Sequence, residues 1–527
     1  MQGARAIRNL AIHRHTDQNP GMNKPHLSMI SGIAIALIAA SAPTVFAEKE
    51  KQSPASAPKI KTPEKAESAI SAARRAFEGG AHAEAVKLAL PLAEKGDADA
   101  IYLLGFAHET GQGAELSPKK AEEFYRKGLA KNHPDSAYRL AFMLLGGKDK
   151  ARITEAQALL EKQALIEPAI AGRILGEAFL LGRFSGTPDP EKAILWWKKS
   201  ADVGDIPSML FLARFYDGQM GFPEKTDLEI STSYFEKAAA AGNTAAMVTV
   251  GARLLYGPEK GRDEKRGLDF LGKAIAANDA AAYQVRGNWQ EIIKQDSKAA
   301  LAEYERGAAA NHLECMVQAA QYYLDGKGTK KDTQRGTDLL KKAAEGGNAQ
   351  AHFFLAAQIL KVEKADRIVG YGHLLAAANG GLPTAQNELG LFYLSGALGL
   401  ADINSAVAWF TQAAKSNFPS AQNNLAALFE RGTGVERNYA TAAQLYTAAA
   451  QQGNAPATLA LARFQAAGVA GAIDLPRAWA LGKIAENRGE QNAAKFLETL
   501  EKDFTKDQLS KAKEQLELLS GKQPAKK

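Results

Sequence analysis

The sequence has very little of what would cross-link the chain or hold it in a membrane. Its 527 residues include a single cysteine, Cys315, so no disulfide can form within one molecule. Because Cys315 lies in an apolar helical pattern, we expect it in the core, and a redox or intermolecular role is the alternative. The apolar run Met29–Ala40 is shorter than the roughly 20 residues that a membrane-spanning helix needs.

Sequence motifs that carry chemistry are also missing. The histidines do not cluster, since His108, His352 and His373 lie in different segments and show no metal-binding spacing. Gly-x-Gly loops such as Gly111–Gly113 follow helical patterns and lack the Gly-Lys-Ser/Thr of a phosphate loop, so we interpret them as turns. No nucleophile motif stands in a plausible context. The sequence therefore predicts a protein that is not an enzyme and uses no cofactor or metal.

Charge of one sign is not concentrated anywhere along the chain. The net charge is +7, and it falls to about +4 without residues 1–47, which carry four basic side chains and one acidic side chain. Opposite charges are mixed, as in Lys119-Lys120 followed by Glu122-Glu123. This pattern is typical of a solvated helix face, and we expect no nucleic-acid partner.

What the sequence has in abundance is internal repetition. A helix-sized segment that ends in Gly-Asn or a related pair returns roughly every 33 to 38 residues. In the copy Ser420–Asn454, apolar residues at helical spacing predict a helix over Ala421–Glu430, and Gly432–Gly434 interrupts it. A second amphipathic helix over Ala440–Gln451 follows. Each unit is therefore expected to be helix, turn, helix, turn.

Small and large side chains recur within these units. Alanines such as Ala351, Ala385 and Ala421 begin first helices, which would let neighbouring helices approach closely. We interpret a set of aromatic residues in the second helices as packing between helices rather than as ligand contacts. The set comprises Trp197, Phe235, Phe270, Tyr304, Phe410, Tyr446 and Trp479.

Several of these positions together resemble the Sel-one-like repeat (SLR) family, a branch of the tetratricopeptide-like helical solenoids. Its pattern starts A-x-x-x-L-G-x-x-Y, which Ala385, Leu389, Gly390 and Tyr393 match, and it ends in an aromatic helix and a Gly-Asn or Gly-Asp pair. The resemblance covers roughly residues 66–519. Some copies depart from the pattern: Ala280–Asn311 and Ala349–Gly380 lack the Gly-x-Gly loop, and Glu167-Pro168 replaces the usual repeat end.

The periodicity and the resemblance predict an all-α protein, a right-handed superhelical solenoid of about eleven helix-turn-helix repeats. We expect the repeat array over residues 66–490, capping helices over 491–519 and a disordered tail over 520–527. Residues 48–65 are rich in Pro, Lys and Ser, which is typical of a disordered linker.

Residues 1–47 have the pattern of a signal peptide region. Met29–Ala40 has the length of its apolar core, Val45-Phe46-Ala47 fits cleavage after Ala47, and Met22 is the expected translation start. The protein is then periplasmic or secreted, with no stable transmembrane anchor after cleavage. An uncleaved membrane anchor is the alternative.

A repeat array offers a long surface, so the sequence favours a scaffold that binds a protein or peptide partner in a concave groove lined by first helices. The resemblance implies a role in assembling or regulating an envelope complex of a bacterium. One alternative is a peptidoglycan-proximal protein that binds or hydrolyses cell-wall glycan or peptide; another is an exported effector that engages host proteins. The candidate partner-binding residues are Tyr102, Tyr138, Trp196, Asn387 and Asn423.

Overall fold

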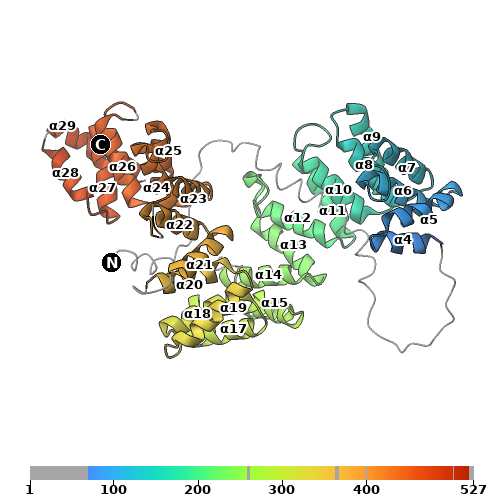
Figure 1. Cartoon of the computed structure of the whole chain (residues 1–527), viewed down its shortest axis with the longest axis horizontal. Coiled ribbons are helices and arrows are strands. Elements are labelled where there is room, and N and C mark those ends of the chain that lie inside the picture. The colour runs from blue at the N-terminus through green and yellow to red at the C-terminus, as the bar shows by residue number, and fades with distance from the viewer. Residues whose placement is uncertain are drawn as a thin grey trace. The chain divides into compact units, whose positions relative to one another are not determined.

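The computed structural model describes residues 69–257, 261–361, 367–397, 399, 401–469, 471–502 and 504–520. These residues form 26 α-helices and one short 3-10 helix, with no strand among them (Figure 1). The predicted all-α repeat fold is confirmed for this part of the chain. The expected signal peptide region, the linker over 48–65 and the tail beyond Ser520 lie outside the described residues. No described helix is both long enough and apolar enough to cross a membrane.

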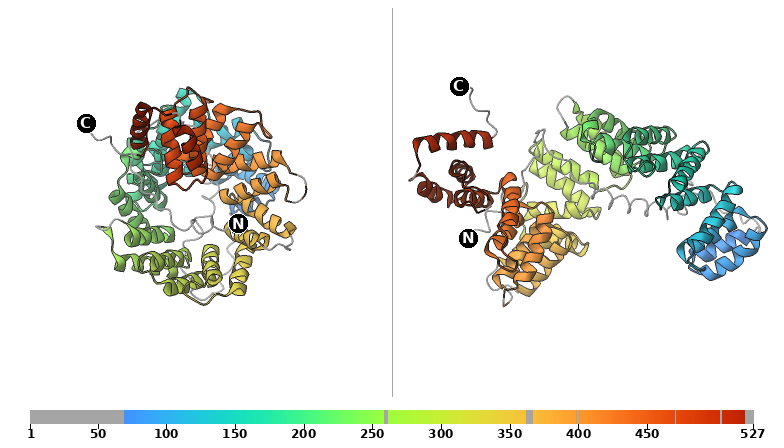
Figure 2. Two further views of the ribbon diagram at one scale, coloured as in Figure 1. Left: turned by 90° about the vertical axis from the view of Figure 1, so that its left-hand side faces the viewer. Right: turned by 90° about the horizontal axis from the view of Figure 1, so that it is seen from above.

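The chain divides into two compact units, Met1–Tyr234 and Phe235–Lys527, and each is described by itself. In the first unit, successive helices pair along the chain (Figures 1 and 2). Its helices are α4 (Ala69–Glu78), α5 (His82–Glu94), α6 (Ala98–Thr110), α7 (Pro118–Ala130), α8 (Pro134–Leu145), α9 (Lys150–Gln163), α10 (Pro168–Leu180), α11 (Pro190–Asp202), α12 (Ile206–Tyr216) and the 3-10 helix η1 (Pro223–Lys225). The boundary between the units falls within α13 (Leu228–Ala240).

The second unit continues the same plan of paired helices. Its members are α14 (Thr244–Tyr256), α15 (Glu264–Ala276), α16 (Ala281–Ile292), α17 (Ser297–Ala309), α18 (Leu313–Asp325), α19 (Thr333–Glu345), α20 (Ala349–Leu360), α21 (Arg367–Asn379), α22 (Pro383–Ser395), α23 (Ile403–Lys415), α24 (Pro419–Arg431), α25 (Tyr439–Gln451), α26 (Ala455–Ala467), α27 (Leu475–Asn487), α28 (Ala493–Glu501) and α29 (Lys506–Leu519).

The residue pair that ends each repeat also starts the next first helix. Gly347 adopts a left-handed backbone with φ 85°, and the Asn348 side chain then accepts a hydrogen bond from the Ala351 amide at 2.9 Å. Such a side-chain acceptor satisfies one of the free amides at a helix start. His133 and His312 occupy the same place, and each accepts the capping hydrogen bond through Nδ1.

The expected departure at Glu167 is real. Glu167 precedes α10 at the capping position, but its side chain makes no capping hydrogen bond. The turn before it leaves Leu165 86% exposed and Ile166 68% exposed. This repeat junction therefore lacks the hydrogen bond that fixes most of the others.

A close contact between a glycine of the first helix and an aromatic ring of the second helix forms the core of several repeats. A Cβ added at Gly390 would lie 2.6 Å from the Phe410 ring, and one at Gly287 would lie 2.4 Å from the Tyr304 ring. Distances below 3.0 Å cannot be tolerated without movement, so glycine is what lets these helices approach. Ala385 and Ala421, the predicted small packing residues, are both fully buried.

The predicted burial of the aromatic residues at one repeated helix position is confirmed for most of them. Two of them, Phe270 and Trp479, do not occupy that position. Trp197 and Phe410 occupy the eighth position after the cap of their helices and are buried. Phe270 is only half-buried, because Leu271 fills the equivalent place and is fully buried. Trp479 is buried but lies at the fifth position after its cap, where its indole N–H donates to Glu501 Oε1 at 2.5 Å.

Cys315 is buried in the core, as the sequence predicts, and its Sγ packs against Gly307. Burial raises the pKa of the thiol to about 12. We expect iodoacetamide at pH 8 to alkylate Cys315 at least about a hundredfold more slowly in the folded chain than in urea, because the thiolate is the nucleophile. Because the pKa is raised on folding, stability should also fall as the pH rises from 9 toward 12. Equal alkylation rates, followed by mass spectrometry, would contradict a buried thiol.

Candidate protein-binding site

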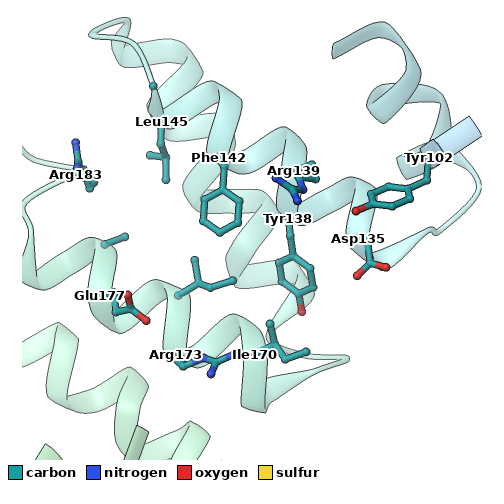
Figure 3. A pocket seen from close by; sticks show the side chains of 13 residues that line it. Tyr102, Asp135, Tyr138, Arg139, Phe142, Leu145, Ile170, Arg173, Glu177 and Arg183 are labelled. Atoms are coloured by element: carbon teal, nitrogen blue, oxygen red, sulfur yellow. The ribbon is translucent and has the colours of Figure 1, made fainter. Parts of the chain in front are cut away.

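Three successive first helices, α6, α8 and α10, border a pocket in the first unit (Figure 3). Its volume is about 230 Å³, below the roughly 300–1,000 Å³ of pockets that hold small molecules or cofactors. This size suits one or two amino-acid side chains. The residues that line the pocket are Tyr102, Asp135, Tyr138, Arg139, Phe142, Leu145, Gly146, Ile170, Arg173, Ile174, Glu177, Ala178 and Arg183.

Two of the candidate residues, Tyr102 and Tyr138, meet at this pocket. Each is the fifth residue after the cap of its helix, so the repeat itself places them at equivalent positions on α6 and α8. Both are 6% exposed, and burial raises the pKa of both phenols. The Tyr102 ring also stacks on His133 with 4.8 Å between ring centroids. The two tyrosines are therefore neutral, fixed parts of the pocket wall.

Glu167, which does not cap α10, instead holds one of these tyrosines. The Tyr138 hydroxyl donates a hydrogen bond to Glu167 Oε2 at 2.9 Å, and Gln163 Nε2 donates to the same oxygen at 3.4 Å. At this irregular repeat junction, the Glu167 carboxylate thus orients Tyr138 at the pocket.

Three arginines contribute to the pocket, and they differ in how they are held. Arg139 Nη1 lies 3.5 Å from Glu109 Oε1, and its guanidinium lies 4.9 Å from the centroid of the Phe106 ring. Arg173 and Arg183 form no ion pair with any residue in the described part of the chain. These two guanidinium groups can therefore bind an anion without breaking an existing pair.

Glu177 is the unusual acid of the pocket. Burial raises the pKa of its carboxyl to about 7, against the attraction of Arg173 and with the repulsion of Asp205. Its side chain makes no hydrogen bond or ion pair with the residues that the structure describes. Glu177 therefore binds a proton near neutral pH more readily than an ordinary glutamate does.

The structure does not bring the other three candidate residues to this pocket. Trp196 lies on the second helix α11, half-buried, with Lys199 Nζ 4.1 Å from its ring centroid. Asn387 and Asn423 belong to the second unit, on α22 and α24. Asn387 is buried and accepts a hydrogen bond from Asn424 Nδ2 at 2.9 Å, whereas Asn423 is half-buried.

Sequence reasoning missed the charged and apolar neighbours of the two tyrosines. Phe142 lies four residues after Tyr138 on α8, and Glu177 lies four residues after Arg173 on α10. Residues at this spacing share a helix face, so the pattern was present in the sequence. The repeat pattern does not single out these residues, because the residue types at these positions differ from one copy to the next.

The expectation that the histidines lie apart is wrong for one pair. His352 on α20 and His373 on α21 belong to the same repeat, and their Nδ1 atoms lie 2.9 Å apart. Burial and the neighbouring His352 lower the pKa of His373. Within the residues that the structure describes, no group of three or more histidine, cysteine, aspartate or glutamate side chains could hold a metal ion.

Comparison with known protein families identifies the repeat. The model of the Sel1 repeat matches more than half of the chain, in eight segments: 98–133, 134–164, 173–205, 206–243, 244–279, 313–348, 383–418 and 419–454. The chain belongs to the Sel1 repeat family. The matches leave out residues 165–172, which include Glu167 and the pocket residue Ile170. All the other residues that line the pocket lie within matched Sel1 repeat segments.

Curated relatives align with only part of this chain. A chitin synthase regulator of Saccharomyces cerevisiae is 28% identical over 52% of this chain and 41% of its own length. An uncharacterised protein of Neisseria meningitidis is 26% identical over 60% of this chain and 58% of its own length. A chitin synthase regulatory factor of Schizosaccharomyces pombe is 28% identical over 62% and 29%. The chain therefore spans less than two thirds of each of these relatives.

Solved structures of Sel1 repeat proteins resemble this one more distantly. A protective antigen of uropathogenic Escherichia coli, which has an SLR fold, is 22% identical with a TM-score of 0.47, covering 83% of this chain and 94% of its own. A Sel1 repeat protein from Oxalobacter formigenes is 23% identical with a TM-score of 0.43, covering 62% and 93%.

Proposed function

We propose that this Sel1 repeat protein is an exported scaffold, periplasmic or secreted, that binds a protein partner through its first helices and thereby assembles or regulates an envelope complex. The observation that carries the proposal is the side-chain-sized pocket across α6, α8 and α10, with two arginines that form no ion pair with the residues that the structure describes. Sel1 repeats suit protein interaction, and two of the curated relatives are named as regulators of chitin synthase. Export rests on the apolar pattern of residues 1–47.

Photo-crosslinking in cells tests this function. A benzophenone amino acid would replace Phe142 in the pocket, and a matched control would carry it at Leu195, which is 51% exposed on the second helix α11. We expect a discrete protein adduct from position 142 and none from position 195. Purified periplasm and medium would show where the adduct forms. Absence of any protein adduct at position 142, together with retention of the chain on purified peptidoglycan, would contradict the proposal.

A further inference from the structure

The pocket has an apolar centre between polar ends. Figure 3 shows Phe142 and Tyr138 side by side on α8, with Ile170 and Arg173 of α10 beneath them and Arg183 at the far edge. The centre therefore favours an aliphatic or aromatic side chain, whose burial would be stabilised by the hydrophobic effect. Its volume of about 230 Å³ leaves room for little more than that side chain and one neighbour.

The charges of the pocket favour an acidic neighbour. Three arginines face two carboxyl groups, and burial raises the pKa of one of those, Glu177, to about 7. A guanidinium group can donate two parallel hydrogen bonds to one carboxylate, which makes arginine the preferred partner of carboxylates at binding surfaces. Because Arg173 and Arg183 have no ion pair in the described part of the chain, they are available for this role.

We infer that the pocket binds a peptide segment of the partner in which an apolar side chain is flanked by an aspartate or a glutamate. The apolar side chain enters between Phe142 and Ile174, and the carboxylate binds Arg173 or Arg183. The inference rests on the proposed function, because it names the chemistry of the segment that the scaffold would recognise.

Glu177 makes this binding depend on pH. A bound carboxylate near Glu177 would disfavour its charged form, so the acidic segment binds best when Glu177 is protonated. Affinity should then rise as the pH falls from 8 to 6, through the pKa of about 7. The charged groups around Glu177 are Arg173 on its own helix, Arg183 in the following turn, Asp135 and Arg139 of α8, and Asp205 at the start of α12.

Selection from a phage-displayed library of random twelve-residue peptides on the full chain tests the inference. We expect the bound peptides to be enriched in Asp or Glu next to Leu, Ile or Phe. For a selected peptide without histidine, fluorescence anisotropy should show about tenfold or greater weakening with Arg173→Gln and Arg183→Gln combined. Lys198→Gln, an exposed cation on the second helix α11, is the matched control and should leave the affinity unchanged.

Fluorescence anisotropy also distinguishes the pH dependence of peptide binding from a loss of affinity that is caused by misfolding. Wild-type affinity should be several-fold higher at pH 6 than at pH 8, and Glu177→Gln should remove that difference by fixing the neutral form. A peptide with its acidic residues changed to amides should lose affinity even if the arginine variants fold poorly. Selected peptides without acidic residues, or no loss with the amide peptide, would overturn the inference. If such a result came with a protein adduct at position 142, the scaffold function would stand and only the ligand chemistry would fall.

Discussion

Gly390→Ala and Phe410→Ala together are expected to cost less stability than the sum of the two single substitutions. The Gly390→Ala methyl would lie 2.6 Å from the Phe410 ring, so we expect overpacking to cost about 1–3 kcal/mol. This exceeds the roughly 1 kcal/mol that alanine gains over glycine in a helix. Phe410→Ala removes a fully buried ring and should cost about 3–5 kcal/mol. In the double variant the new methyl occupies space that the ring has left, which gives a coupling of at least about 1 kcal/mol.

Amide hydrogen exchange over α22 to α25 is the measurement for this cycle, because a repeat array need not unfold as a single two-state unit. Local opening free energies of these helices report the contact directly. Gly272→Ala is the matched control, since Gly272 lies within α15 and nothing stands within 4 Å of the added Cβ. It should stabilise its helix by up to about 1 kcal/mol. Strict additivity of the two core substitutions would show that Gly390 and Phe410 do not share one contact.

Trp197→Ala is the second substitution with a large expected effect, and Trp197→Phe is its comparison. Trp197 is 1% exposed and stacks on Phe211 with 5.3 Å between ring centroids. Its truncation to alanine should cost about 3–5 kcal/mol in α10 and α11. The buried indole Nε1 makes no hydrogen bond within the described residues. Trp197→Phe therefore loses ring volume but no hydrogen bond, and should cost less than about 1.5 kcal/mol.

Exchange rates over α10 and α11 distinguish the two variants. A small cost for phenylalanine and a large one for alanine would confirm that Trp197 acts through packing alone. If phenylalanine destabilised these helices as much as alanine, the indole N–H would have to make a hydrogen bond that the structure does not show.

Local rules explain how much of this fold the sequence revealed. Gly347-Asn348 was recognisable as a repeat end from its residue types, and the structure adds that Asn348 starts the next helix, because capping depends on a residue and its own next three amides. The buried alanines followed in the same way from the repeat period. Phe270 was placed wrongly because two apolar residues, Phe270 and Leu271, are adjacent, and only the position of Gly251 on the facing helix decides between them. A Cβ at Gly251 would lie 2.7 Å from Leu271.

The pocket could be predicted only in part, for a different physical reason. Tyr102 and Tyr138 occupy one repeat position, so the period alone places them on the same face of neighbouring helices. Arg173 and Glu177 occupy positions of α10 whose residue type the repeat pattern does not fix, so the period places their helix but not their chemistry. The pair formed by His352 and His373 was missed because residues 21 apart meet only through the turn between two antiparallel helices.

The self-contained repeat end has an evolutionary consequence. Each regular copy carries its own turn and its own helix start, so gene duplication or loss of a segment such as 419–454 would leave its neighbours correctly joined. The junction at Glu167 differs from that at Asn454, because its carboxylate holds Tyr138 of the preceding copy and makes no capping hydrogen bond to the next helix. Lineages that change their number of repeats should therefore vary the length of the regular stretches and inherit α8 to α10 as a single block.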